Sequence, residues 1–205
     1  MTENITFQGI NAVKLENGEI CAVVIPELGG KVASLYSKIK DFELFFQCSD
    51  DLKSLELYSD FAEFGCWGFD DTFPNIAEGE VTVGGRQVKY PDHGEIWTMP
   101  FDYKLGENSV ELWAESSILP YTYKKTLSIS GNKLEMKYAI ENTGGFPFPC
   151  IWTMHGLLNC REDMEIKFPP GTNEVENVGK SGFLGDIGTV HPYPVTRDLM
   201  GMCTI

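Results

Sequence analysis

Short apolar and polar stretches alternate along the chain, and small turn-forming residues separate them. Asn17-Gly18 and Gly84-Gly85 each stand between two short runs in which apolar and polar residues are mixed as in strands. Asn and Gly tolerate the positive φ angles of a two-residue turn, so both pairs predict tight β-hairpins. The predicted hairpin strands are residues 13–16 with 19–25 and residues 80–83 with 86–90.

Two further turns predict two more hairpins. Gly106-Glu107-Asn108 separates residues 96–105 from 110–114, and Gly131-Asn132 separates 125–129 from 134–140. The last pair alternates with a period of two, so its strands should have one buried and one wet face, as in antiparallel sheets. The face expected to be buried carries Leu127, Ile129, Leu134, Met136, Tyr138 and Ile140, and the other is expected to carry Lys125, Glu135 and Lys137.

One segment favours a helix, and the end of the chain favours loops. Residues 50–61 begin with aspartates that can cap a helix, and Leu52, Leu55 and Tyr58 would share one face of it. The tail from Pro169 is rich in Gly, Pro and Asn, which indicates loops with short strands. Many short strands with frequent turns predict an all-β antiparallel sandwich or barrel, and the absence of repeats and linkers predicts one domain over residues 1–205.

The net charge of the chain limits the classes of partner that it is expected to bind. The 205 residues include 16 Lys and Arg against 30 Asp and Glu, a formal net charge of −14. Nucleic acids and anionic membranes bind clustered basic residues, so neither is an expected partner. No apolar run of about 18 residues predicts a membrane span, and the N-terminus lacks the pattern of a secretory signal. We therefore expect a soluble cytoplasmic protein, monomeric or homodimeric, that acts on a small molecule.

Motifs for several chemistries are missing from the sequence. No two of the six cysteines have the spacing of a zinc or redox motif, and without a secretory signal we expect them to be reduced. No histidine pair has the spacing of a metal site, so we expect no metal. P-loop, dinucleotide-binding and nucleophile-elbow motifs are also lacking.

Three histidines are the candidates for acid–base chemistry, because histidine titrates nearest to neutral pH. His93 stands beside acidic and glycine residues in a turn before a strand-like run. His155 follows an apolar run and precedes Gly156, whereas His191 lies in the irregular tail. A single histidine is more often structural than catalytic, so the context of each one decides its interpretation.

Aromatic and acidic residues gather in the sequence around the first two histidines. Sugars bind to aromatic rings through their C–H faces and to carboxylates or amides through their hydroxyls, so this mixture favours a carbohydrate pocket. The alternative is that the aromatic residues are simply core. The candidate substrate-binding residues are Trp67, Asp70, Asp71, Trp97 and Trp152.

Three segments, taken in order, resemble the galactose mutarotase-like (aldose 1-epimerase) superfamily. The first runs through Pro26 and Gly29-Gly30, the second continues from Phe73-Pro74-Asn75 through a hairpin to His93-Gly94, and the third leads from Asn142-Thr143 through two prolines to His155. Together these segments lie within residues 10–160. The resemblance implies a large antiparallel β-supersandwich and an isomerase of carbohydrate metabolism that interconverts α and β anomers of an aldose without a cofactor.

The resemblance also implies roles for individual residues. His155 would be the general acid that protonates the pyranose ring oxygen, and His93 would hold or polarise that oxygen. His191 precedes Pro192-Tyr193, a pair that often follows the second active-site histidine of the superfamily, but the Asn-Thr and proline pattern upstream favours His155.

Two departures from the superfamily pattern keep alternatives open. Asn75 stands where epimerases have a sugar-binding arginine, so the substrate contacts must differ and the sugar is not identified. The general base of the superfamily is a glutamate far beyond the second histidine, and no glutamate after His155 has a matching context, which suggests a C-terminally short domain. The alternatives are a non-catalytic carbohydrate-binding protein and an accessory domain of a lyase or glycosidase.

Overall fold

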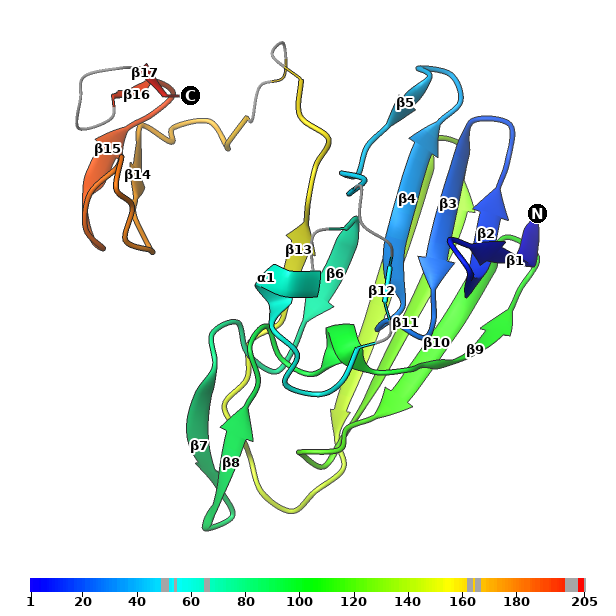
Figure 1. Ribbon diagram of the computed structural model, residues 1–205, viewed down its shortest axis with the longest axis horizontal. Coiled ribbons are helices and arrows are strands. Elements are labelled where there is room, and N and C mark those ends of the chain that lie inside the picture. Colours follow the sequence, from blue (N-terminus) through cyan, green and yellow to red (C-terminus); the bar gives the residue numbers. More distant parts are fainter. Residues whose placement is uncertain are drawn as a thin grey trace. The chain divides into compact units, whose positions relative to one another are not determined.

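The computed structural model describes residues 1–48, 52–53, 55–64, 67–161, 164, 167–197 and 203–204. The chain divides into two compact units, Met1–Cys160 and Arg161–Ile205. The first unit contains both predicted catalytic histidines and most of the strands (Figure 1). The expected single domain over residues 1–205 stays a prediction.

The first sheet of the larger unit is antiparallel throughout, in the order β1-β2-β3-β4-β6-β13, with β5 paired to β4. The hairpin predicted at Asn17-Gly18 joins β2 to β3 and is confirmed. The Asn17 side chain accepts hydrogen bonds from the backbone amides of Glu19 and Ile20, which fixes the turn. The strands are β1 (Thr2–Phe7), β2 (Ile10–Glu16), β3 (Ile20–Ile25), β4 (Lys31–Ser37), β5 (Phe42–Glu43), β6 (Phe69–Thr72) and β13 (Thr153–Gly156).

The second sheet packs against the first and has the order β12-β11-β10-β9. Its hairpins turn at Gly106-Glu107-Asn108 and Gly131-Asn132, as predicted. Apolar side chains from both sheets form one core cluster, which confirms the all-β sandwich. The strands are β9 (Asp102–Leu105), β10 (Ser109–Glu115), β11 (Tyr121–Ser130) and β12 (Lys133–Asn142).

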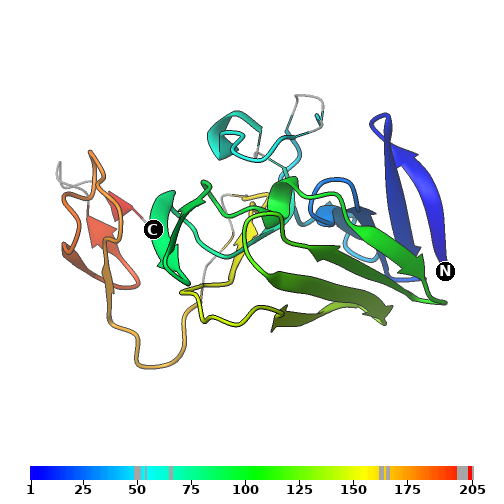
Figure 2. The same ribbon diagram turned by 90° about the horizontal axis from the view of Figure 1, so that it is seen from below.

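Shorter elements lie outside the two sheets. The predicted hairpin at Gly84-Gly85 is confirmed as β7 (Gly79–Val83) and β8 (Arg86–Tyr90). Part of the expected strand over residues 96–105 is instead the 3-10 turn η1 (Ile96–Thr98), and only β9 is extended. The one-turn helix α1 (Phe61–Phe64) lies on one side of the first sheet, and β10–β12 lie on the other (Figure 2).

The prediction of a helix over residues 50–61 is wrong for the residues of this segment that the structure describes. Residues 52–53 and 55–60 are not helical, and α1 begins only at Phe61, while residues 50, 51 and 54 lie outside the described residues. The apolar spacing of this segment has a different cause: Leu52 is buried in a small cluster with Trp67 and Leu28, and Leu55 packs against that cluster. Asp60 caps α1, because its carboxylate accepts a hydrogen bond from the Ala62 amide at 2.7 Å.

The predicted exposure of one residue of β11 is also wrong. Lys125 was expected on the wet face, but it is fully buried and shares the inward face of β11 with Leu127 and Ile129. A period of two places residues 125, 127 and 129 on the same side, so the burial follows the strand geometry. The charge is accommodated because the Nζ atom of Lys125 lies 2.6 Å from the carboxylate of Asp71.

The second unit consists of loops and short strand pairs, as predicted for the tail. Strands β14 (Glu174–Glu176) and β15 (Val190–Pro192) form one pair, and β16 (Thr196–Arg197) and β17 (Cys203–Thr204) form another. Among the described residues, Cys21, Cys48, Cys150 and Cys160 are not joined in disulfides. None of the described helices is long and apolar enough to cross a membrane.

Candidate functional site

His93 and His155 lie together in the structure although 62 positions separate them in the chain. Their imidazole ring centroids are 5.2 Å apart and the ring planes are nearly perpendicular, at 81°. One side chain comes from the turn after β8, and the other comes from β13. Two titratable groups at this distance can act on a single small substrate, which is the arrangement that concerted acid–base chemistry needs.

Strand pairing places His155. In the antiparallel pair of β13 and β6, His155 lies directly opposite Asp70, and Thr153 lies opposite Thr72. The hydroxyls of Thr153 and Thr72 are 2.6 Å apart, which fixes this register. Opposed residues of an antiparallel pair point to the same face, so His155 and Asp70 share the face of the sheet that is turned away from the main core.

A left-handed turn places His93. Both His93 and Gly94 have positive φ angles, 57° and 73°. The turn is tied to Phe73, whose carbonyl accepts a hydrogen bond from the Glu95 amide at 3.0 Å, and to Ile76, whose carbonyl accepts one from the His93 amide at 2.6 Å. A non-glycine residue with positive φ is strained by about 1–3 kcal/mol, so the surroundings of His93 hold it in place.

The carboxylate of Glu95 anchors this turn to the second sheet. Glu95 is fully buried, and it accepts hydrogen bonds from the hydroxyls of Ser116, Ser117 and Tyr121. The distance from the Tyr121 hydroxyl is 2.7 Å. Because a buried carboxylate is stable only when it is well partnered, Glu95 is a structural anchor for His93.

Replacing Gly94 with Ala should destabilise the protein by roughly 3 kcal/mol or more. A Cβ at this position would lie 2.2 Å from the Phe73 carbonyl oxygen and 2.8 Å from the Phe73 nitrogen, both backbone atoms. Urea unfolding measures the loss. Gly85→Ala is the matched control, because its φ is also positive, at +80°, but nothing lies within 4 Å of the added methyl. Equal losses in the two variants would contradict the steric argument.

A phenylalanine that the sequence did not single out packs against both imidazoles. The ring of Phe61 stacks on His93 with centroids 4.0 Å apart and an interplanar angle of 18°. It also meets His155 edge-on at 4.7 Å and Trp97 at 4.9 Å. Phe61 is the first residue of α1, and no local pattern marks it as part of a site.

Charged groups surround the imidazoles at close range. The Nδ1 atom of His93 is 3.0 Å from a carboxylate oxygen of Asp92, without the alignment of a hydrogen bond. Opposite His155, Asp70 forms a buried ion pair with Lys31 at 2.5 Å, and Lys31 also donates to the Trp67 carbonyl at 2.9 Å. Burial raises the pKa of the Asp70 carboxyl, although Lys31 opposes the shift.

The stability of the protein should fall below pH 6.5 because of His155. Burial, together with the positive charges of His93 and Lys31, lowers the pKa of this imidazole from 6.5, and Asp70 opposes the shift. Between the lowered pKa and 6.5 the unfolded chain binds more protons, so the free energy of unfolding decreases as the pH falls through that window. Urea unfolding at about pH 7.5 and about pH 5.5 measures this, and His155→Asn should lose less stability than the wild type. An equal loss in both proteins would contradict the assignment.

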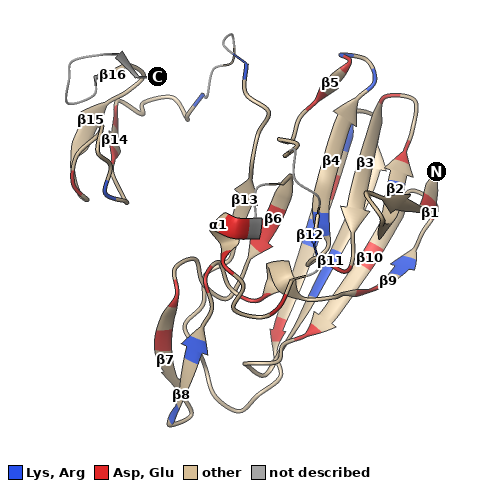
Figure 3. Cartoon of the chain, viewed as in Figure 1, with Lys and Arg blue, Asp and Glu red and all other residues tan. Residues whose placement is uncertain are grey.

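The two neighbouring aspartates expected to bind substrate lie in buried ion pairs on opposite faces of β6. Asp70 pairs with Lys31 of β4 beneath His155, and Asp71 pairs with Lys125 of β11 inside the sandwich. In Figure 3 the acidic patch of β6 stands out against the tan sheet. One oxygen of each carboxylate, Oδ1, is buried without a hydrogen bond.

The other predicted substrate-binding residues have structural contacts. The Asn75 amide is buried and donates to the carbonyls of Ala77 and Pro91 at 2.8 and 2.6 Å. Trp67 is buried in the cluster around Leu28, and Trp97 is buried with its indole N–H donating to the Asp92 carbonyl at 3.1 Å. Trp152 packs on Tyr138 and donates to the Tyr123 hydroxyl at 3.0 Å.

His191 belongs to the second unit. It is buried on β15, and its Nε2 atom lies 2.8 Å from the Leu184 carbonyl oxygen. A buried ring with a backbone partner is a structural histidine, so nothing in its surroundings indicates catalysis.

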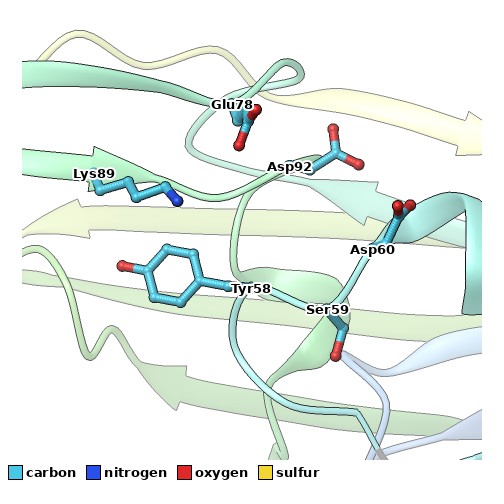
Figure 4. Close-up of a pocket in the computed structure, with 6 residues that line it drawn as sticks. All are labelled: Tyr58, Ser59, Asp60, Glu78, Lys89 and Asp92. Carbon is cyan, nitrogen blue, oxygen red and sulfur yellow. The ribbon is translucent and has the colours of Figure 1, made fainter.

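A cavity of about 270 Å³ is lined in part by Asp92, the residue whose carboxylate contacts His93; neither imidazole lines the cavity itself. It is lined by Tyr58, Ser59, Asp60, Glu78, Lys89 and Asp92. The Lys89 ammonium lies 5.2 Å from the centre of the Tyr58 ring, and the three carboxylates stand along the other side of the cavity (Figure 4). An aromatic ring beside several hydrogen-bonding groups suits a small polyhydroxylated ligand. In the part of the chain that the structure describes, no group of three His, Cys, Asp or Glu side chains is placed to hold a metal ion.

The chain has the galactose mutarotase-like fold. No protein-family model matches the sequence, and no curated protein matches it, so the fold is recognised from solved structures. A protein from Synechocystis is similar at 17% identity and a TM-score of 0.68, covering 94% of this chain and 68% of that one.

Two further structures similar to this chain are of proteins described as galactose mutarotase-like or related. A galactose mutarotase-like protein from Clostridium acetobutylicum is 17% identical with a TM-score of 0.61, covering 97% of this chain and 64% of that one. A galactose mutarotase related enzyme from Lactobacillus acidophilus is 18% identical with a TM-score of 0.52, covering 64% of this chain and 43% of that one. The chain therefore spans less than two thirds of the length of these two proteins.

Proposed function

We propose that this protein binds aldoses and interconverts their α and β anomers, as an aldose 1-epimerase-like isomerase. The observation that carries the proposal is the meeting of two imidazoles, 5.2 Å apart, and Asp92, which contacts one of them, also lines a cavity of about 270 Å³. Support comes from the galactose mutarotase-like fold of the chain. The fold alone does not define an activity, so the argument rests on the site.

The two histidines divide the work of ring opening. His155, in its protonated form, gives a proton to the ring oxygen while a base takes the proton of the anomeric hydroxyl, and the bond between C1 and the ring oxygen breaks to leave an aldehyde. His93 holds the ring oxygen. Rotation about C1–C2 followed by the reverse steps gives the other anomer, so all atoms are conserved and no cofactor is consumed. Each well-placed acid or base contributes roughly 10²–10⁴ in rate.

The cavity carboxylates are the described candidates for the base and for sugar contacts. Asp60, Glu78 and Asp92 line the space beside His93. In this proposal the predicted binding residues support the site rather than contact the sugar, because each of them already has at least one polar contact within the protein. These supporting residues are Trp67, Asp70, Asp71, Asn75, Trp97 and Trp152.

Anomer interconversion tests the proposal directly. Freshly dissolved α anomers of several neutral aldoses are followed by polarimetry and by exchange NMR, with and without the protein. We expect a rate above the buffer rate that increases in proportion to protein concentration. A panel of aldoses that shows no rate above buffer would overturn the proposal.

A non-catalytic carbohydrate-binding protein is the second candidate. It is favoured by the engagement of the two carboxylates nearest to the imidazoles: Asp70 pairs with Lys31, and Asp92 contacts His93. Saturation-transfer NMR with the same aldoses separates the two candidates. Saturable binding without catalysis would select the binding protein, and the lack of any binding would exclude both.

A further inference from the structure

Neither imidazole is oriented by a hydrogen bond at its Nδ1 atom, although the Nδ1 atom of His93 lies 3.0 Å from the Asp92 carboxylate without the alignment of a hydrogen bond. The Nδ1 atoms of His93 and His155 are both buried, and neither has a hydrogen-bond partner within the described part of the protein. Metal-bound and catalytic histidines are usually oriented by a bond at this nitrogen. Here the packing of neighbouring side chains must contribute to holding the rings at their mutual angle of 81°.

Phe61 is the side chain that both imidazoles share. It covers a face of His93 at 4.0 Å with nearly parallel planes, and it meets His155 edge-on at 4.7 Å. Trp97 supports it from a third direction at 4.9 Å, and only 7% of Phe61 remains exposed. Aromatic pairs in such stacked and edge-to-face arrangements are worth about 0.5–1.5 kcal/mol each beyond simple burial.

The position of Phe61 is itself determined. It begins α1, and the Asp60 carboxylate caps that turn through the Ala62 amide at 2.7 Å. The ring comes from a segment separate from the one that carries His93 and the one that carries His155. A contact from this third segment can therefore set the relation between the other two.

We propose that Phe61 is a positioning residue for the ring-opening reaction, and that its ring holds the two imidazoles at a fixed angle and keeps water from the side they share. The effect of Phe61 on catalysis rests on the proposed function. Its packing against the two imidazoles does not depend on any sugar being the substrate. Misplacing a catalytic group by about 1 Å costs roughly 10²-fold in rate, so a residue that never touches the substrate can control the reaction.

The matched variants are Phe61→Leu, which keeps an apolar side chain but removes the ring, and Phe61→Tyr, which keeps the ring. Phe61→Met is a second ring-free variant whose flexible side chain refills the space. Phe101→Leu is the control: Phe101 is also buried, at 5% exposed, but its ring contacts are with Tyr123 and Lys125 in the main core. The charged groups that act on His155, namely His93, Asp70 and Lys31, are unchanged in all four variants.

Two measurements decide the proposal. The first is the titration of His155 by ¹H–¹⁵N NMR, in which Phe61→Leu and Phe61→Met should raise the pKa of His155 towards 6.5 as water enters, while Phe61→Tyr and Phe101→Leu should leave it as in the wild type. The second is steady-state mutarotation, in which the ring-free variants should lose about 10- to 100-fold in kcat with little change in KM.

The two proposals fail in different ways. If no variant and no wild-type protein acts on any aldose, the proposed function falls, and the titration alone still judges the role of Phe61. If His155 titrates identically in the wild type, Phe61→Leu and Phe61→Met, the positioning role is overturned whether or not the protein is an enzyme.

Discussion

Replacing His155 with Asn should reduce kcat/KM for anomer interconversion by about 10²–10⁴. Asn is close in size to the imidazole but cannot deliver a proton to the ring oxygen at neutral pH, so the loss measures the general acid. Polarimetry with a fresh α anomer gives the rate. The fold should be kept, because the strand pairing around His155 depends on backbone bonds and on the Thr72–Thr153 contact at 2.6 Å.

Variants of His93 test whether the two histidines act together. His93→Asn should also reduce the rate, and the double variant His93→Asn/His155→Asn should lose little more than the worse single variant, because residues that act together are not additive. His191→Asn tests the alternative in which His191, rather than His155, is the second active-site histidine. We expect no loss of rate, because this ring contacts the Leu184 carbonyl in the second unit. A large loss in His191→Asn with none in His155→Asn would reverse the assignment.

Replacing Lys125 with Met should destabilise the protein by about 3–5 kcal/mol, because it leaves the carboxylate of Asp71 buried and unpaired. Both side chains of this ion pair are fully buried, and 2.6 Å separates the Nζ atom from the carboxylate oxygen. For a chain of this size, this loss corresponds to a fall in Tm of roughly 6–20 °C. Thermal unfolding followed by circular dichroism measures it.

Two further variants isolate the buried charge as the cause. Lys124→Met is the adjacent control: this lysine is half exposed and pairs with Glu111 at 2.9 Å on the surface, so its loss should cost no more than about 1 kcal/mol. Asp71→Asn/Lys125→Met removes both charges and should recover most of the stability lost in Lys125→Met. If the double variant were less stable than the single one, the ion-pair explanation would be wrong.

The hairpins were predictable because the information that determines them is local. Asn17-Gly18, Gly84-Gly85 and Gly131-Asn132 supply the backbone freedom that the turns need, and the strands on either side pair as expected. The all-β class follows from these turns. The meeting of His93 and His155 was implied only by the resemblance to the superfamily, since their positions in the chain say nothing about distance.

The groups around the histidines could not be predicted in the same way, because they depend on contacts between distant segments. Lys125 carried one usable signal, namely that it lies two residues from Leu127 on the inward face of β11. Lys31 and Phe61 carried none: a lysine after two glycines and a phenylalanine after an aspartate are ordinary at the surface. Of the two carboxylates expected to bind sugar, Asp70 lies opposite His155 whereas Asp71 points into the sandwich, and each is paired with a buried lysine.

The position of His155 on β13 has a consequence for how firmly the general acid is held. In the described part of the first sheet β13 is the outermost strand, only four residues long, and β6 is its single neighbour. Such a strand can separate from its sheet at a free-energy cost below that of global unfolding. Brief local openings would take His155 away from His93 while the core between the sheets stays intact. The proposed acid therefore lies on an edge strand, and any local opening of β13 would limit the fraction of time in which both histidines face a sugar together.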